Sequence, residues 1–216
     1  MGVKLDKICK TIKGTHVLTN VNAYFPDGVI TGLKGINGSG KTMIMRIISG
    51  LIRPTSGNVL IDDLQLWKDI SFPDDIGLLI ENPAFLPYLT GFDNLKMLAD
   101  IRGKIGAPDI SRALLQVGLE PKDKRKYGQY SLGMKQRLGI AAAFMEHPHI
   151  LLLDEPTNAL DTQGVDLLKD ILISKKKRGN TVILSCHDYQ VLRELSDNIY
   201  IVENGSILRY EKVKDE

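Results

Sequence analysis

The sequence predicts a mixed α/β fold in which a helical segment interrupts a core of alternating strands and helices. Apolar runs at residues 150–153 and 181–185 are typical of buried parallel strands, and helical stretches alternate with them. A glycine-rich loop at residues 35–40 lies between an expected strand and an expected helix. Residues 83–147 show mostly helical patterning instead. Together these observations indicate an α/β core with a helical insert.

The N-terminal part of the core is predicted to begin with a subdomain of antiparallel strands. Gly14 and Gly28 lie in the turns that separate the first three strands. The helix after the glycine-rich loop begins at Lys41 and ends before Gly50, because glycine is favoured at helix C-termini. The expected strands are residues 3–12, 16–25, 29–33, 58–62 and 75–80.

The insert at residues 83–147 is predicted to hold three helices. Thr90 and Asp93 have the spacing of a capping box at the start of the first helix. Pro108 marks the start of the second helix, and Ser131 is a favoured N-cap residue for the third.

Beyond the insert the α/β alternation resumes. Helices are expected over residues 161–177 and 188–195, and Asn204-Gly205 is a strong hairpin signal near the end of the chain. A length of 216 residues suits one domain. We therefore expect a single domain, with an α/β core of residues 1–82 and 148–216 and a helical subdomain of residues 83–147.

The composition is that of an ordinary globular protein with balanced charge. The 28 Lys and Arg residues nearly match the 26 Asp and Glu residues, and a net charge of +2 does not favour nucleic acid as a partner. No segment approaches the roughly 18 apolar residues that a membrane-spanning helix needs. Cys9 and Cys186 lack metal-ligand spacing, so neither a zinc site nor a disulfide framework is expected.

The glycine-rich loop fits the P-loop pattern, in which a strand, a loop and a helix hold a nucleotide phosphate. Its glycines let backbone N–H groups turn toward a phosphate, and the helix N-terminus adds a positive dipole. Lys41 is expected to reach the β- and γ-phosphates, and the Thr42 hydroxyl is expected to ligate Mg²⁺. The alternative is a plain glycine-rich turn, which the strand–loop–helix context disfavours. The loop reads Gly35-Ile36-Asn37-Gly38-Ser39-Gly40-Lys41-Thr42.

Two adjacent carboxylates follow the apolar strand at residues 150–153. Asp154 lies at the carboxyl edge of that strand, where a carboxylate can hold Mg²⁺ or its water. Glu155 points to the other face and is expected to polarise an attacking water. The two acids could instead belong to a helix-capping turn, but the P-loop favours the metal and catalytic interpretation.

Three further segments, together with the P-loop and the two carboxylates, resemble the motifs of ABC ATPases, a family of P-loop NTPases with a RecA-like core. Residues 130–137 resemble the signature loop, residues 158–161 the D-loop, and residues 185–188 the switch-histidine region. The order of these motifs covers nearly the whole chain. The segments read Tyr130-Ser131-Leu132-Gly133-Met134-Lys135-Gln136-Arg137, Asn158-Ala159-Leu160-Asp161 and Ser185-Cys186-His187-Asp188.

The resemblance implies ATP and Mg²⁺ as cofactors and a dimer that encloses ATP between two copies. In that family the P-loop of one copy faces the signature loop of the other, so Ser131 and Gly133 would bind the nucleotide in trans. Asp161 of the D-loop would join the nucleotide-binding residues. His187 would contact the γ-phosphate and hold the attacking water in register with Glu155. Hydrolysis would then require the dimer.

Three residues outside the signature loop depart from the family pattern. Met43 replaces a second hydroxyl after the P-loop threonine, so one contact to the α-phosphate is expected to be lost. Ile12 stands where an aromatic residue usually stacks on adenine, and it offers an apolar face without π-stacking; His16 is a weaker candidate platform. Glu81 occupies the position of the Q-loop glutamine, and we expect it to ligate Mg²⁺ directly or through water.

The signature loop also departs from the pattern, because Leu132 and Met134 stand where Gly and Gln are usual. Together with residues 80–83 and 85–90, it resembles a bacterial subgroup linked to bacitracin and lantibiotic-type peptide antibiotic export. This resemblance implies a cytoplasmic ATPase, paired with a second copy or a homologous subunit, that drives separate permease subunits at the inner face of the membrane. The apolar residues of segment 85–92 are expected either to dock those permease subunits or to fill the core of the insert.

A soluble ABC ATPase that acts on nucleic acid or ribosomes is the alternative from a different functional class. Such proteins tend to carry two cassettes or a long coiled-coil insertion, whereas this sequence has one cassette and a short insert. A regulator that binds nucleotide without hydrolysing it is disfavoured by the presence of Lys41, Asp154, Glu155 and His187.

Overall fold

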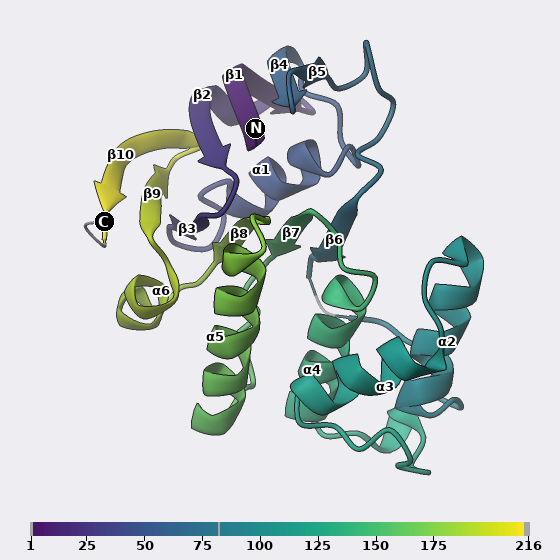
Figure 1. The fold of residues 1–216 in the computed structure, drawn as a ribbon. Coiled ribbons are helices and arrows are strands. Elements are labelled where there is room, and N and C mark those ends of the chain that lie inside the picture. Colours follow the sequence, from purple (N-terminus) through teal and green to yellow (C-terminus); the bar gives the residue numbers. More distant parts are fainter. Residues whose placement is uncertain (1, 82, 214–216) are drawn as a thin grey trace.

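Two β-sheets organise the chain, and the computed structural model describes residues 2–81 and 83–213 (Figure 1). The larger sheet has six strands in the order β10-β9-β3-β8-β7-β6. All of its strand pairs are parallel except the one between β10 and β9. Every residue of β7 and β8 is buried, as expected for parallel strands covered on both faces. The strands are β3 (Ile30–Lys34), β6 (Ile76–Leu79), β7 (Ile150–Leu153), β8 (Thr181–Ser185), β9 (Asn198–Glu203) and β10 (Ser206–Lys212).

The smaller sheet is antiparallel throughout and has the order β2-β1-β4-β5. Helix α1 (Lys41–Ile48) lies between the two sheets (Figure 1). Its Ile44 and Ile47 side chains join Val3 of the smaller sheet and Leu152 of the larger sheet in one buried apolar cluster. The helix that follows the glycine-rich loop is therefore anchored on both sides. The strands are β1 (Gly2–Ile12), β2 (Thr15–Pro26), β4 (Ser56–Ile61) and β5 (Leu64–Gln65).

The remaining helices share a second apolar cluster with the larger sheet. Figure 1 shows α2, α3 and α4 grouped beyond β6, while α5 stands beside them below β8. Helix α4 packs so closely against β6 that a Cβ at Gly77 would lie only 1.8 Å from the carbonyl oxygen of Ala143. The helices are α2 (Gly91–Arg102), α3 (Ala107–Gln116), α4 (Leu132–Phe144), α5 (Thr162–Lys177) and α6 (Tyr189–Leu195), with a 3₁₀ turn at Tyr127–Gln129.

The register of the parallel strands brings three functional segments to one edge of the sheet. Leu33 of β3 pairs with Ser185 of β8, and Leu153 of β7 pairs with Leu184 of β8. These strands run in the same direction, so the loops that leave their carboxyl ends meet at this edge. Ligand sites of α/β proteins occur at such edges.

The expected strands and helices are present, with ends within two residues of those predicted. The sequence interpretation missed the short strand β5 and the 3₁₀ turn. The capping box at Thr90 is half formed: its hydroxyl oxygen accepts from the Asp93 N–H at 3.1 Å, but the Asp93 carboxylate bonds the Thr90 hydroxyl rather than its backbone N–H. Asn204 and Gly205 have φ values of 47° and 75°, which suit the predicted hairpin turn.

Segment 85–92 contributes two side chains to the core of the insert, as one of its two expectations had it, and the docking expectation stays a prediction. The Phe85 ring packs edge-on against Tyr127, with ring centroids 5.3 Å apart, and both Phe85 and Phe92 contact the second apolar cluster. Tyr88, by contrast, is 64% exposed. The two phenylalanines therefore support the fold, while Tyr88 is free to contact another molecule.

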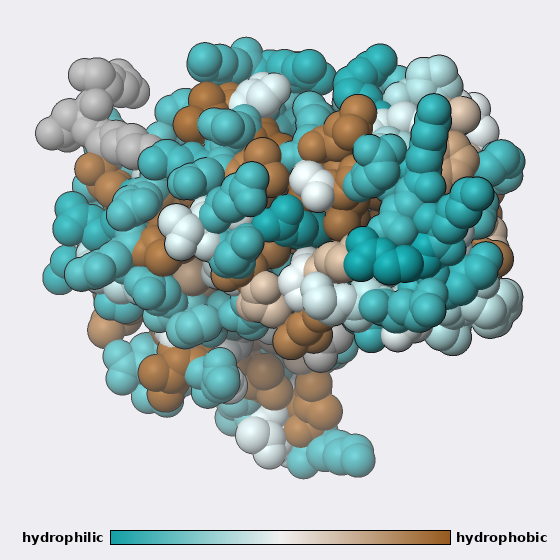
Figure 2. Space-filling model, turned by 90° about the horizontal axis from the view of Figure 1, so that it is seen from below, coloured by the Kyte–Doolittle hydropathy of each residue, from teal (hydrophilic) through white to brown (hydrophobic). Residues whose placement is uncertain are grey.

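None of the helices in the described residues is long and apolar enough to span a membrane. Figure 2 shows apolar side chains interspersed with hydrophilic ones over the face seen from below, rather than one continuous apolar band.

A buried lysine makes the stability of the fold depend on pH. Lys175, in the last turn of α5, is only 5% exposed, and its Nζ donates weakly to the carbonyl oxygen of Phe144 at 3.4 Å. Burial is the main cause that lowers its pKa from 10.5 to about 8, and nearby Arg178 lowers it further. Between these two values the unfolded chain retains a proton that the folded chain has lost. The free energy of unfolding should therefore rise as pH increases from 8 to 10.5.

We expect Lys175→Met to stabilise the protein at pH 7 by about 1–3 kcal/mol, because the buried charge is removed. The gain should shrink as pH rises through 10, where the wild-type lysine is already neutral. Urea unfolding at pH 7 and pH 10 measures the gain in the free energy of unfolding at each pH. Lys177→Met, at an exposed position of the same helix, is the matched control and should change little. An equal gain at both pH values would contradict this account.

Candidate functional site

The glycine-rich loop between β3 and α1 needs its glycines to keep its shape. Gly38 and Gly40 have φ values of 81° and 113°, in the left-handed region that glycine adopts readily. A Cβ at Gly35 would lie 2.3 Å from the carbonyl oxygen of Val202. The loop borders a cavity of about 360 Å³, called here the P-loop cavity. It is lined by Val17, Asn37, Gly38, Ser39, Gly40, Lys41, Thr42, Met43, Arg46, Asp154 and Glu155.

The Lys41 ammonium lies within the curl of this loop. Lys41 is buried, and its Nζ donates to the carbonyl oxygens of Gly35 at 2.6 Å and Ile36 at 3.2 Å. The same Nζ lies 3.8 Å from Oε1 of Glu155. A buried ammonium between a loop of backbone N–H groups and a carboxylate is suited to an anionic phosphate chain.

Asp154 connects the carboxyl ends of two strands to α1. The Thr42 hydroxyl donates to its Oδ2 at 2.6 Å, and the Ser185 hydroxyl donates to its Oδ1 at 2.6 Å. The carboxylate is buried, at 8% exposure, beside the P-loop cavity. A hydroxyl and a carboxylate oxygen are hard donors of the kind that Mg²⁺ prefers with nucleotide phosphates. The donor set therefore fits the expected Mg²⁺.

Glu155 faces the same cavity from the next position of the chain. Its φ of 49° is left-handed, and its backbone N–H donates to the Ser185 hydroxyl oxygen at 2.8 Å. Its Oε2 accepts from the His187 N–H at 3.1 Å and lies 3.0 Å from Nδ1 of the same histidine. Within the described residues its buried Oε1 has no hydrogen-bond partner. One carboxylate oxygen is thus held by His187, and the other faces the Lys41 ammonium at 3.8 Å.

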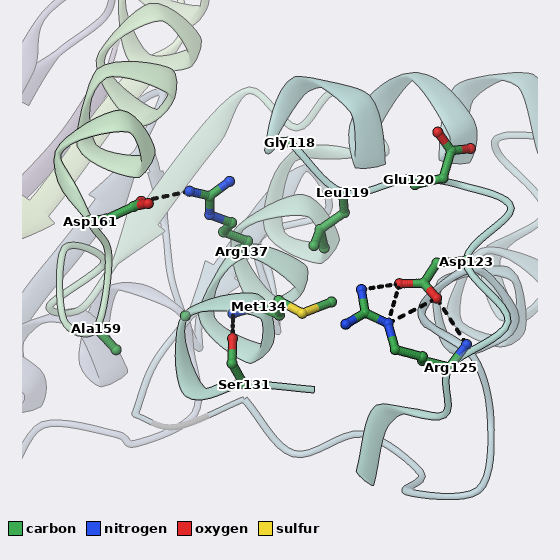
Figure 3. A pocket seen from close by; sticks show the side chains of 11 residues that line it. Gly118, Leu119, Glu120, Asp123, Arg125, Ser131, Met134, Arg137, Ala159 and Asp161 are labelled. Carbon is green, nitrogen blue, oxygen red and sulfur yellow. Dashed lines mark hydrogen bonds and ion pairs between the residues drawn. The ribbon is translucent and has the colours of Figure 1, made fainter. Parts of the chain in front are cut away.

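The signature segment forms the N-terminus of α4 and borders a second cavity, called here the signature cavity, of about 490 Å³. The Ser131 hydroxyl oxygen accepts from the Met134 N–H at 3.2 Å (Figure 3). A Cβ at Gly133 would lie 2.8 Å from the carbonyl oxygen of Ala159, so the D-loop can pass this closely only over a glycine. Its lining comprises Gly118, Leu119, Glu120, Asp123, Arg125, Ser131, Gly133, Met134, Arg137, Ala159 and Asp161.

Asp161 is the N-cap of α5 and is also tied to the signature helix. Its Oδ1 accepts from the Gly164 N–H at 2.9 Å and from Nη2 of Arg137 at 2.6 Å (Figure 3). The hydrogen bond from Arg137 is the main cause that lowers the pKa of this carboxyl group. In the part of the chain that the structure describes, the signature cavity and the P-loop cavity share no lining residue.

Three candidate residues are placed at the margins of the P-loop cavity or outside it. Met43 lines the cavity, as expected for the residue after Thr42. Ile12, at the end of β1, is 39% exposed and does not belong to the lining, whereas Val17 does. The Glu81 carboxylate forms an ion pair with Arg46, a residue of α1 that lines the cavity. Asn82, part of the Q-loop segment, lies outside the described residues.

A family model described as ABC transporter matches residues 18–158, a span that includes the P-loop, the signature segment and both carboxylates. The chain belongs to the ABC transporter family. It is therefore an ABC ATPase, which binds ATP with Mg²⁺ and hydrolyses it.

Curated relatives of this ABC ATPase match nearly all of it. It is 47% identical, over 98% of its length and 97% of the relative, to the uncharacterized ABC transporter ATP-binding protein YybJ of Bacillus subtilis. It is 34% identical to the bacitracin transport ATP-binding protein BcrA of Enterococcus faecalis, over 99% of this chain and 70% of that protein. It is 38% identical to the lantibiotic transport ATP-binding protein SrtF of Streptococcus pyogenes, over 95% and 89% of the two chains.

Solved structures share the fold. A dimeric post-hydrolysis state of the ATP-binding cassette MJ0796, bound to ADP and Pi, has a TM-score of 0.86 at 29% identity, over 99% of this chain and 100% of that chain. A second dimeric structure of the same cassette has a TM-score of 0.87 at 28% identity, over the same shares of the two chains. The predicted α/β P-loop core with an antiparallel β subdomain and a helical insert is thereby confirmed as the ABC ATPase fold.

Sequence reasoning missed three residues of the ABC site. Ser185 is the most central, because its hydroxyl contacts both Asp154 and the backbone of Glu155. A hydroxyl at the carboxyl end of a neighbouring strand was the available signal. Val17 and Arg46 line the P-loop cavity, but their contact with it depends on how β2 and α1 are placed, which no local motif encodes.

The close approach of Gly133 to the D-loop gives a test of the signature segment. Gly133→Ala should lower ATPase activity at least about tenfold, because the added Cβ forces the D-loop carbonyl or the signature helix to shift. Steady-state ATPase assays measure the effect, and thermal unfolding checks that the variant folds. Gly106→Ala is the matched control, since its Cβ would meet only Pro108 at 3.6 Å. Equal activity of the two variants would contradict the expected constraint.

Proposed function

We propose that this ABC ATPase is the energy subunit of a bacterial exporter for peptide antibiotics or similar amphiphiles. The observation that carries the proposal is its similarity to transport ATP-binding proteins named for bacitracin and lantibiotics, at 34–38% identity over most of the chain. The altered signature loop and Glu81 support the same assignment. A soluble role on nucleic acid has no comparable support.

The working unit of this proposal is a dimer that encloses two ATP molecules with Mg²⁺. The P-loop cavity and the signature cavity are separate in one chain. A second copy, or a homologous ATPase subunit, would bring its Ser131 and Gly133 against the γ-phosphate held by the first. The N-terminus of α4 borders the signature cavity, and such a terminus favours negative charge.

Four polar side chains of the P-loop cavity, together with His187 and Asp161, have roles in the proposed hydrolysis. Lys41 binds the β- and γ-phosphates. Thr42 and Asp154 would hold Mg²⁺, and the bound ion would supply positive charge beside the phosphate oxygens. Glu155 orients the attacking water and accepts its proton. His187 fixes the Glu155 carboxylate and reaches the γ-phosphate. Asp161 contributes from the D-loop, where Arg137 holds its carboxylate.

The permease would dock on the surface between the α/β core and the helical insert. Exposed apolar side chains occur on the elements that border this junction. Leu51, Phe72, Tyr88, Met97 and Ile101 are between 42% and 76% exposed. A structural relative at 27% identity is described as part of the ABC transporter complex cbiONQ, so a cassette of this fold does assemble with other subunits. We propose that the present ATPase attaches in this way to the inner face of the membrane.

Replacement of the proposed base tests the function directly. Glu155→Gln should bind ATP but lose turnover by about 10²–10⁴-fold, because the amide cannot accept the proton of the attacking water. It should also accumulate as an ATP-bound dimer on gel filtration. Asp170→Asn, an exposed change on α5, is the control and should behave as wild type. A Glu155→Gln protein that stays monomeric with ATP would contradict the enclosed-nucleotide model.

We propose that Glu81 ligates Mg²⁺ directly or through water once ATP is bound. Its ion-pair partner, Arg46, lies one turn of α1 beyond Thr42, the other expected Mg²⁺ ligand on this side. Glu81→Gln should then raise the Mg²⁺ concentration needed for half-maximal ATPase activity about tenfold. Titration of the ATPase rate with magnesium measures this concentration. Arg46→Gln is the companion variant, because it breaks the ion pair but keeps the Glu81 carboxylate. An unchanged magnesium requirement in Glu81→Gln would exclude the metal role.

A further inference from the structure

The signature cavity is larger than the P-loop cavity, and it extends well beyond the residues that a γ-phosphate would contact. The cavity volumes are about 490 Å³ and 360 Å³. In Figure 3, Arg125 lies on the side of the signature cavity away from Ala159 and Asp161, and the Met134 side chain extends toward it. The part of the cavity near Arg125 and Met134 therefore presents a planar guanidinium and a thioether. The part near Ser131 presents hydrogen-bond donors instead.

Arg125 is held in a fixed orientation by Asp123. Its Nε lies 3.1 Å and 3.0 Å from the two carboxylate oxygens, and its Nη2 lies 2.7 Å from Oδ2 (Figure 3). The Arg125 N–H also donates to Asp123, at 2.9 Å. These hydrogen bonds lower the pKa of Asp123 and raise that of Arg125, so both groups stay charged near neutral pH.

The charge balance of this pair favours an aromatic ring over a phosphate. The Asp123 carboxylate offsets the charge of Arg125 along the guanidinium edge, but the flat face of the guanidinium stays open, and the side chain is 57% exposed. A guanidinium face stacks well on planar π-systems. Met134 adds polarisable sulfur, which also packs well against aromatic rings.

The lining of the P-loop cavity determines which side chains of its own copy the adenine ring would meet. Within the described residues its lining includes Val17 but no aromatic side chain, and Ile12 lies outside that lining. The adenine of an ATP molecule bound beside Val17 would therefore meet aliphatic groups, and the exposed His16, 3.1 Å from the Thr11 hydroxyl, is the candidate π-stacking partner of its own copy.

We propose that Arg125, with Met134, binds the adenine ring of the ATP molecule held by the P-loop of a second copy. The base would then be stacked in trans by the same copy that supplies Ser131 and Gly133. This assignment rests on the proposed enclosure of ATP between two copies. It makes Arg125 a nucleotide-binding residue of the composite site.

The test uses pairs of copies that can form only one composite site. All copies carry Glu155→Gln to prevent turnover. A Lys41→Ala copy, which cannot hold nucleotide at its own P-loop, is tethered to a surface at low density. A mobile copy with an intact P-loop is applied with Mg·ATP below the concentration at which it pairs with itself. The single ATP molecule in the complex then faces the signature cavity of the tethered copy.

Arg125→Ala in the tethered copy should weaken ATP-dependent binding of the mobile copy about five- to thirtyfold. The same change in the mobile copy should leave binding to the tethered Lys41→Ala copy unaltered, because that Arg125 faces an empty P-loop. Arg112→Ala in the tethered copy is the matched control, since Arg112 is also exposed and paired with an aspartate, Asp109. It should have no effect.

Three outcomes would overturn the proposal. Equal binding with and without Arg125 in the tethered copy would exclude a role for this residue. A loss seen only when the mobile copy is changed would assign Arg125 to its own nucleotide. Full retention by Arg125→Lys would show that charge, rather than the planar face, is what binds. Failure of the unchanged mobile copy to bind the tethered Lys41→Ala copy with ATP would instead refute the enclosed dimer itself.

Discussion

A chain of short hydrogen bonds across the carboxyl ends of two neighbouring strands holds the catalytic machinery together. The Thr42 and Ser185 hydroxyls each donate to one oxygen of Asp154 at 2.6 Å, and the Glu155 N–H donates to Ser185 at 2.8 Å. This network ties α1, β7 and β8 into one rigid unit. Because it orients Asp154 and Glu155 at once, the proposed metal ligand and the proposed catalytic carboxylate are positioned together.

The local motifs of the sequence were sufficient to predict the architecture and most of the residues that line the P-loop cavity. Gly38 and Gly40 identify a loop that only glycine tolerates, and an apolar strand followed directly by Asp154 identifies the edge of the sheet where the site lies. These features depend on residues close together in the chain. The sequence pattern therefore specifies them without knowledge of the tertiary fold.

Residues that depend on packing between distant elements were not predictable in this way. Val17 reaches the P-loop cavity because β2 crosses beside α1, and Arg46 meets Glu81 because the end of β6 lies next to that helix. Arg125 was missed for another reason: its partner Asp123 is only two residues away, but the pair lies in a loop without regular structure. None of these contacts leaves a periodic or motif-like signal.

In the proposed dimer, each chain carries two incomplete halves of a nucleotide site. The most direct test is the ATPase rate per chain as a function of protein concentration, with light scattering to report the oligomeric state. If two copies enclose the nucleotide, the rate per chain must rise with concentration as monomers pair. A constant rate per chain, while the protein remains monomeric with ATP, would contradict the account.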